Sequence, residues 1–94
     1  MLKEFRAVVQ NIIPDGEHGA YAVCTLDPAN LFISGSVTFS LSSDVWKEKS
    51  WPTPGTFVML NFLFKKRAGW RAEKARLYSP EDEERFIQTT KLIT

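Results

Sequence analysis

The sequence is poor in the residues that build disulfides and metal sites. It contains one cysteine, Cys24, and one histidine, His18, among 94 residues. A single cysteine forms no disulfide within the chain and no cysteine-based zinc site. This usage is typical of a reducing compartment, so we expect a cytoplasmic protein without a metal or any other cofactor.

Long hydrophobic runs and catalytic motifs are lacking too. The longest apolar stretch, residues 57–64, is interrupted by Asn61 and followed by two lysines, whereas a membrane helix needs about 20 apolar residues. The first residues show no basic region leading into an apolar stretch, so no signal peptide is expected. No glycine-rich phosphate loop, nucleophile elbow or pair of buried carboxylates is visible. We therefore expect neither a membrane protein nor an enzyme.

What the sequence does contain is the composition of one folded domain, with 44% hydrophobic and 13% aromatic residues. Turn signals at short intervals separate segments that are rich in β-branched and aromatic residues. The expected strands are residues 2–13, 20–26, 31–41 with a bend at Gly35, 56–64 and 70–78. Five short strands fit a small barrel, because closure removes exposed sheet edges. The sequence predicts an all-β, five-stranded OB-type barrel over residues 1–78, with an SH3-like barrel as the structural alternative.

Two of these segments show the alternation of a half-buried strand. In the second, Tyr21, Val23 and Thr25 share one face, and the other face carries Ala20, Ala22 and Cys24. In the third, apolar residues at 37, 39 and 41 alternate with Ser36, Thr38 and Ser40. The apolar set of the third segment is expected to face the core. A polar connection over residues 42–51 follows and holds Trp46 and Trp51.

Residues 79–94 differ in kind from the barrel segments. Ser79 and Pro80 precede four consecutive acidic residues, 81–84, which is the signature of a helix start. We expect a short C-terminal helix from Pro80 to about Gln88. The apolar residues that are available to pack this extension on the barrel are Phe86, Ile87, Leu92 and Ile93.

The net charge is only +1, but the charges are unevenly distributed. Residues 65–76 hold six of the twelve Lys and Arg residues against the single acid Glu73, which gives +5. Residues 81–85, with four acids and one arginine, give −3. A basic hairpin is therefore followed by an acidic element, which raises the hypothesis that the acidic element masks the hairpin.

The order of segments resembles a cold-shock domain, the small OB-type barrel of RNA chaperones. Residues 18–23 (HGAYAV) and 36–42 (SVTFSLS) lie where that family has its two ribonucleoprotein motifs. Residues 54–60 (PGTFVML) and 69–77 (GWRAEKARL) are similar to its closing hairpin. The resemblance implies binding of single-stranded RNA or DNA. In this alignment, however, the family's base-stacking aromatic positions fall on Ala20, Ala22 and Thr38, so most of its aromatic platform is missing.

We therefore expect single-stranded nucleic acid, RNA in the first instance, to be bound mainly by the basic hairpin, because cations attract phosphates and aromatic rings stack on bases. The candidate contacts are His18, Tyr21, Trp46, Trp51, Lys65, Lys66, Arg67, Trp70, Arg71, Lys74 and Arg76. If Leu77 faces the core, strict alternation turns Trp70 outward with Lys74 and Arg76. Trp46 and Trp51 either stack on bases or plug the barrel end, and the plug is favoured. His18 is either a phosphate contact or an ordinary loop residue.

The alternative function is a protein-interaction module that has lost nucleic-acid binding. On this hypothesis a face of small residues accepts a partner chain or a second copy, as a homodimer. That face would consist of Ala20, Ala22, Ser36, Thr38 and Ser40.

Overall fold

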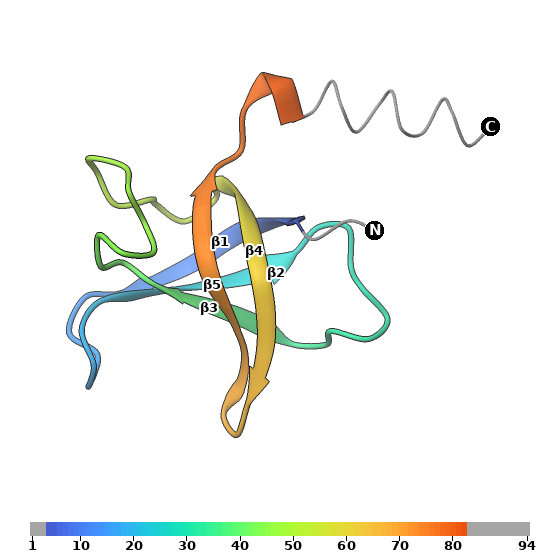
Figure 1. Cartoon of the computed structure of the whole chain (residues 1–94), viewed down its shortest axis with the longest axis horizontal. Coiled ribbons are helices and arrows are strands. Elements are labelled where there is room, and N and C mark those ends of the chain that lie inside the picture. The colour runs from blue at the N-terminus through green and yellow to red at the C-terminus, as the bar shows by residue number, and fades with distance from the viewer. Residues whose placement is uncertain (1–3, 83–94) are drawn as a thin grey trace.

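The computed structural model describes residues 4–82 of the chain, and these residues form five β-strands (Figure 1). The strands are β1 (Glu4–Ile13), β2 (Tyr21–Leu26), β3 (Ser36–Ser40), β4 (Phe57–Lys66) and β5 (Gly69–Leu77). They pair in the order β1-β2-β3-β5-β4, and β4 pairs with β1 to close the barrel. The predicted all-β fold with a closed five-stranded barrel is confirmed.

The strand order distinguishes between the two barrel types that the sequence left open. All neighbouring strands are antiparallel except β3 and β5, which pair in parallel through Val37 with Trp70 and Thr38 with Arg71. A barrel in which consecutive strands lie side by side, as in the SH3-like alternative, would place β3 next to β4. Here β5 separates them, which is consistent with the OB-type arrangement.

The core is built from the inward-facing residues of all five strands. Val37 and Phe39 are fully buried and Leu41 nearly so, which confirms the predicted inward face of the third segment. Four alanines leave room for the larger side chains around them, as a narrow barrel requires. The buried apolar residues are Ala7, Val9, Ala22, Cys24, Leu26, Val37, Phe39, Leu41, Trp46, Val58, Leu60, Ala72 and Ala75.

The proposed face of small residues does not exist as one surface. Ala22 is fully buried and pairs with Phe39, whereas Thr38 lies on the outer side opposite Val23. Because neighbours along a strand point to opposite sides, Ala22 and Thr38 belong to different faces. The alignment with the cold-shock pattern therefore placed the wrong residues of β2 outward: Tyr21, Val23 and Thr25 face out.

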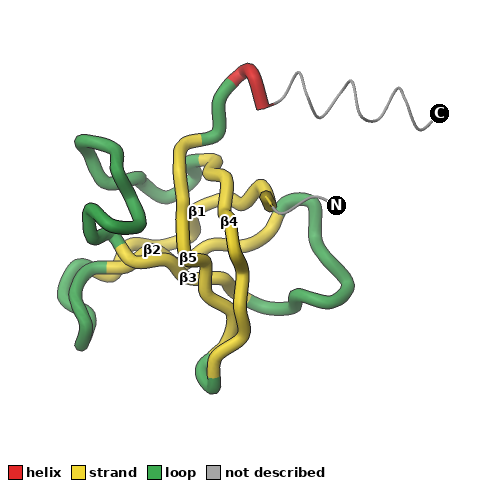
Figure 2. The backbone as a smooth tube through the Cα atoms, viewed as in Figure 1, coloured by secondary structure: helices red, strands yellow, loops and turns green. Residues whose placement is uncertain are grey.

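The third strand is shorter than predicted, because residues 31–35 form a loop. The side-chain oxygen of Asn30 accepts hydrogen bonds from the backbone N–H groups of Phe32 (2.8 Å) and Ile33 (3.2 Å). Such a local side-chain turn competes with strand pairing. Loop 27–35 and the connection 41–56 lie on opposite sides of the barrel (Figure 2).

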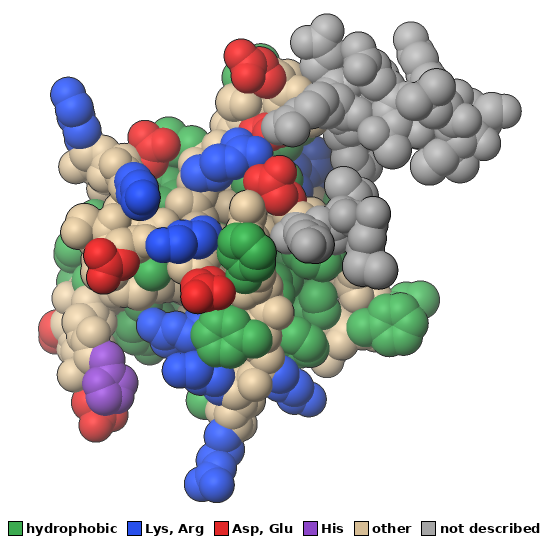
Figure 3. Space-filling view, in the orientation of Figure 1, with side chains coloured by type: hydrophobic (Ala, Val, Ile, Leu, Met, Phe, Trp, Pro, Cys, Tyr) green, Lys and Arg blue, Asp and Glu red, His purple; other side chains and the backbone are tan. Residues whose placement is uncertain are grey.

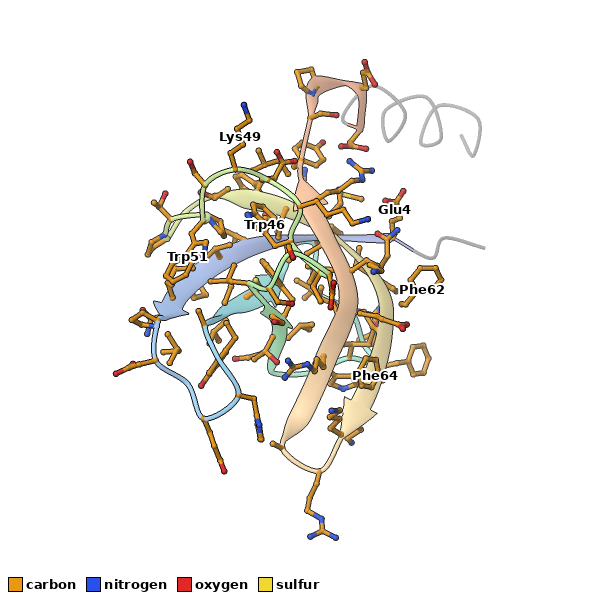
Figure 4. All side chains as sticks on the ribbon, turned by 60° about the vertical axis from the view of Figure 1, so that its left-hand side comes forward. Glu4, Trp46, Lys49, Trp51, Phe62 and Phe64 are labelled. Carbon is orange, nitrogen blue, oxygen red and sulfur yellow. The ribbon has the colours of Figure 1, made fainter. Side chains whose placement is uncertain are left out.

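The two tryptophans of the connection 41–56 differ in burial (Figure 4). Trp46 is buried, stacks on Phe39 with 5.5 Å between ring centroids, and donates its indole N–H to the Ser50 carbonyl at 2.8 Å. It plugs the barrel end as predicted and is not available to bases. Trp51 is half exposed, so the favoured prediction that it also plugs the barrel is wrong.

The chain leaves the barrel through a short helical turn at residues 80–82. The Asp82 carboxylate accepts hydrogen bonds from both the backbone N–H and the hydroxyl of Ser79, each 2.9 Å long. The predicted start of the C-terminal helix is thus present. The rest of that prediction, to Gln88, and the four apolar residues of the extension lie outside the described residues. Within residues 4–82, no helix is long and apolar enough to cross a membrane.

Candidate nucleic-acid interface

A kink shared by β4 and β5 decides which side chains of the closing hairpin face outward. Inward-facing residues of a regular strand are two positions apart. Here they are three apart, because Leu63 follows Leu60 in β4 and Ala75 follows Ala72 in β5. At the kink, the ladder lacks a pair between Phe62 and Glu73, and Phe62 has a φ of 57°. Both strands therefore exchange their inner and outer faces halfway along.

The kink overturns the expected orientation of Trp70. Its side chain is partly buried and packs against the core, on the same side as Ala72. Lys74 faces outward beyond the kink, and Leu77 is 41% exposed instead of facing the core. The prediction assumed strict alternation along the whole strand and was therefore wrong. Trp70 lines an apolar depression, and its cross-strand neighbour on β4 is Lys65.

Two of the six predicted cations are engaged by the protein itself. The Lys74 ammonium donates to the carbonyl of Asp44 at 2.6 Å, which ties β5 to the connection 41–56. Arg76 donates to Glu4 (2.9 Å) and through both terminal nitrogens to Asp82 (2.7 and 2.8 Å). These contacts raise the pKa of Arg76 and hold the pKa of the Asp82 carboxyl well below its usual range. Arg76 is thus neutralised at the end of β5 that is remote from the hairpin turn.

The other four cations have no acidic partner among the described residues. They are Lys65, Lys66, Arg67 and Arg71. No described carboxylate lies within 4.0 Å of any of them, including Glu73 on the same hairpin. Because unpaired cations keep their full charge in water, this end of the hairpin retains a positive field that the net charge of +1 conceals.

Two phenylalanine rings, Phe62 and Phe64, project from the same side of β4 (Figure 4). Phe62 is 54% and Phe64 36% exposed. Arg71 is the cross-strand neighbour of Phe64, and the Lys66 ammonium lies 5.6 Å from the centroid of the Phe64 ring. We call the following group the hairpin surface: Phe62, Phe64, Lys65, Lys66, Arg67 and Arg71. In the space-filling view, cations and hydrophobic side chains intermingle on the face formed by β4 and β5 (Figure 3).

A row of outward residues continues from the hairpin surface across the barrel. Phe64 pairs with Arg71, Arg71 with Thr38, and Thr38 with Val23. The row therefore crosses β4, β5, β3 and β2 at one level. It is uncharged beyond Arg71, so it could support a bound chain but adds no further attraction for phosphate.

The remaining candidate residues are not gathered at this surface. Tyr21 faces outward at the start of β2, but its ring packs so closely on the preceding turn that a Cβ at Gly16 would lie 2.7 Å from it. His18 is exposed in that turn. Trp51 lies in the connection 41–56, away from the labelled rings of β4 (Figure 4). The structure thus brings four of the predicted cations together at the hairpin end and places Tyr21, Trp46 and Trp51 elsewhere. Trp70 remains the cross-strand neighbour of Lys65.

Sequence reasoning missed the two aromatic residues that do lie beside the cations. In strict alternation Phe62 and Phe64 share a face with Val58 and Leu60, which are fully buried. The signal that could have found them is the uninterrupted run Phe62-Leu63-Phe64 directly before two lysines. Neighbouring residues of a strand point to opposite faces, so Leu63 cannot face the core together with Phe62 and Phe64. Either Leu63 or the two phenylalanines must therefore face outward.

The hairpin surface consists of cations and aromatic rings. No group of three or more His, Cys, Asp or Glu residues in the described part of the chain is placed to hold a metal ion. The only cysteine is buried in the core, where desolvation raises its pKa to about 12. Comparison with family models, with curated proteins and with solved structures finds no match to this chain. The hairpin surface therefore supplies the observations from which a function can be inferred.

Proposed function

We propose that this protein binds single-stranded nucleic acid, RNA in the first instance, at the hairpin surface and catalyses no reaction there. The observation that carries the proposal is the exposed Phe64 ring beside Lys66 and Arg71. Lys65 and Arg67 lie at the same end of the hairpin without an acidic partner among the described residues, and Phe62 is exposed on the same strand. The cations would bind phosphates and the rings would stack on bases. An unpaired strand offers both groups at once, whereas the bases of a duplex are already stacked on each other.

The magnitudes favour a modest affinity with little sequence choice. A base stacked on one aromatic side chain contributes about 1–3 kcal/mol, and any base offers a ring face. The outer row at Thr38 and Val23 has few groups that could read base edges. Binding should therefore be tolerant of sequence and should depend on salt.

The test is a titration of a dye-labelled oligouridylate, followed by fluorescence anisotropy. Lys66→Ala with Arg67→Ala should weaken binding about tenfold at low salt, which corresponds to about 1.4 kcal/mol. The matched control removes two exposed cations outside the hairpin, Lys47 and Lys49, and lowers the net charge by the same amount. It should leave the affinity nearly unchanged.

The stacking part of the proposal has its own pair of variants. Phe64→Ala should weaken binding by about 1–3 kcal/mol. Phe32→Ala removes a ring that is 87% exposed in loop 27–35, outside the hairpin surface, and should have no effect. Equal losses in both members of either pair would contradict a site on the hairpin. Absence of binding by the folded wild-type protein at low salt would refute the proposal altogether.

A further inference from the structure

A second surface of the barrel is apolar and contains no cation. Five side chains line a depression of about 220 Å³: Phe5, Ile33, Phe62, Leu63 and Trp70. They come from β1, loop 27–35, β4 and the first residues of β5. Next to Ile33 along the chain, Leu31 and Phe32 are 96% and 87% exposed. Figure 3 shows hydrophobic side chains gathered on the side of the molecule where this loop lies.

This exposure is costly for an isolated domain. Fully burying a Leu or Phe side chain contributes about 1.5–3 kcal/mol, and a soluble protein rarely leaves a contiguous apolar patch without a use. The kink in β4 adds to the apolar surface by turning Phe62 out at a φ of 57°. We therefore expect an apolar group to cover the depression.

The end of the described chain is tied to β1, one of the strands that border this depression. A single nitrogen of Arg76, Nη2, donates to Glu4 at 2.9 Å and to Asp82 at 2.7 Å. Glu4 directly precedes Phe5, which lines the depression. The last described residue is thus joined through one guanidinium group to the neighbour of a lining residue.

We propose that the C-terminal segment 83–94 of the same chain occupies the depression. Twelve residues follow Asp82, and four of them are apolar: Phe86, Ile87, Leu92 and Ile93. Their length reaches about 18 Å as a helix and about 40 Å when extended. The extended length exceeds the roughly 23 Å of β5 between Leu77 and Trp70, so the segment can reach the far end of the depression.

Covalent attachment favours this occupant over a separate molecule. A segment joined to the barrel without a linker is present at an effective concentration in the millimolar range. A second copy of the chain would have to bind more tightly than that to displace it. The depression shares Phe62 with the hairpin surface but is lined by none of the four unpaired cations, and its occupation is tested without nucleic acid.

The experiment is NMR spectroscopy of the full chain with labelled methyl groups and tryptophan. We expect nuclear Overhauser contacts from the Phe86 ring and the Ile87 methyl groups to Ile33, Leu63 and the Trp70 indole. Phe86→Asp with Ile87→Asp should abolish these contacts and shift the resonances of the lining residues. Thr89→Asp with Thr90→Asp adds the same charge to the same segment and should preserve the contacts. An unchanged Trp46 indole resonance in both variants reports that the barrel remains folded.

Three results would overturn the proposal. The lining residues could show no contact with the segment in the wild-type protein. They could be contacted instead by Leu2, which precedes Phe5 along the chain. Contacts to the segment could also arise only between a labelled and an unlabelled molecule in a mixed sample, which would identify a second copy as the occupant. No nucleic acid is present in any of these measurements, so their outcome leaves the test of the hairpin surface separate.

Discussion

The side chain of Arg76 links three parts of the protein at the atomic scale. It holds Glu4 at the start of β1 and Asp82 after the end of β5. Asp82 also accepts two hydrogen bonds from Ser79, so its carboxylate is saturated with donors. Only the charged form can accept all of them, which is why the pKa of Asp82 lies below its usual value. Arg76 is therefore a structural cation, although its type and position in the sequence suggested a phosphate contact.

This network predicts a specific pH dependence. A carboxyl group whose pKa is lowered by folding contributes its full stabilisation above its unfolded pKa of about 3.9. This contribution decreases below that value and is lost as the pH falls through the lower pKa of the folded state. Asp82→Asn should lower the free energy of unfolding by about 1–2 kcal/mol at neutral pH, less than for a fully buried pair because Arg76 is 39% exposed. Urea unfolding at about pH 7 and about pH 2 should show a smaller difference from wild type at the acid pH. A difference that is equal at both pH values would contradict the network.

The buried thiol of Cys24 gives a second prediction at this scale. Its pKa of about 12 leaves only about one molecule in ten thousand as thiolate at pH 8, and the sulfur is fully buried. Native protein should react with a thiol-specific disulfide reagent only as fast as the barrel opens. The same protein in denaturant should react at the rate of a free cysteine. Rapid stoichiometric reaction of the native protein would show that Cys24 is accessible.

At the scale of elements, the kink of β4 shapes both the hairpin surface and the depression. It turns Phe62 outward to border the hairpin surface and the depression, and it leaves Trp70 inside. A phenylalanine at positive φ carries backbone strain of about 1–2 kcal/mol that glycine would not have. The strain persists because the ladder on both sides, from Val58 with Leu77 to Lys66 with Gly69, fixes the register.

The strain predicts an unusual order of stability for two variants. In an ordinary strand alanine is more stable than glycine by about 0.5–1 kcal/mol. At position 62 the order should reverse, with Phe62→Gly more stable than Phe62→Ala by about 1 kcal/mol. Both variants lose the same ring, so their difference isolates the backbone. Chemical denaturation measures it, and an order with alanine more stable would show that the positive φ is not maintained in solution.

The sequence predicted those elements whose pattern is local. Alternation at 36–41 placed the inner face of β3 correctly, and turn signals separated all five strands. The sequence could not predict where the alternation of inner and outer residues breaks, because the kink at Phe62 depends on how β4 pairs with β5. For the same reason the side of Trp70 was wrong, while Lys65 to Arg67 at the hairpin turn needed no knowledge of the register. The sequence also could not predict the hydrogen bond between Arg76 and Glu4, because these residues are 72 positions apart in the chain.

At the scale of the whole molecule, the charge distribution matters more than the net charge. The hairpin turn and the exit of the chain at residues 79–82 lie at opposite ends of β5 (Figure 1). Asp82 consequently neutralises Arg76 and does not approach the four unpaired cations. Among the described residues, the acids after β5 thus leave the hairpin surface open to phosphate.

Because of this separation, the salt dependence of the binding affinity should report how many cations bind phosphate. For single strands, the logarithm of the association constant falls with the logarithm of salt concentration by about 0.7 for each neutralised phosphate. The four unpaired cations predict a slope of at most about −3, whereas participation of all six Lys and Arg residues of the hairpin would give about −4. Lys66→Ala with Arg67→Ala should bring the slope to about −1.5, while the Lys47 and Lys49 control should leave it unchanged. A wild-type slope near −4 would mean that Lys74 leaves Asp44, and Arg76 leaves Glu4 and Asp82, to bind the ligand. A slope near zero would exclude phosphate as the main contact.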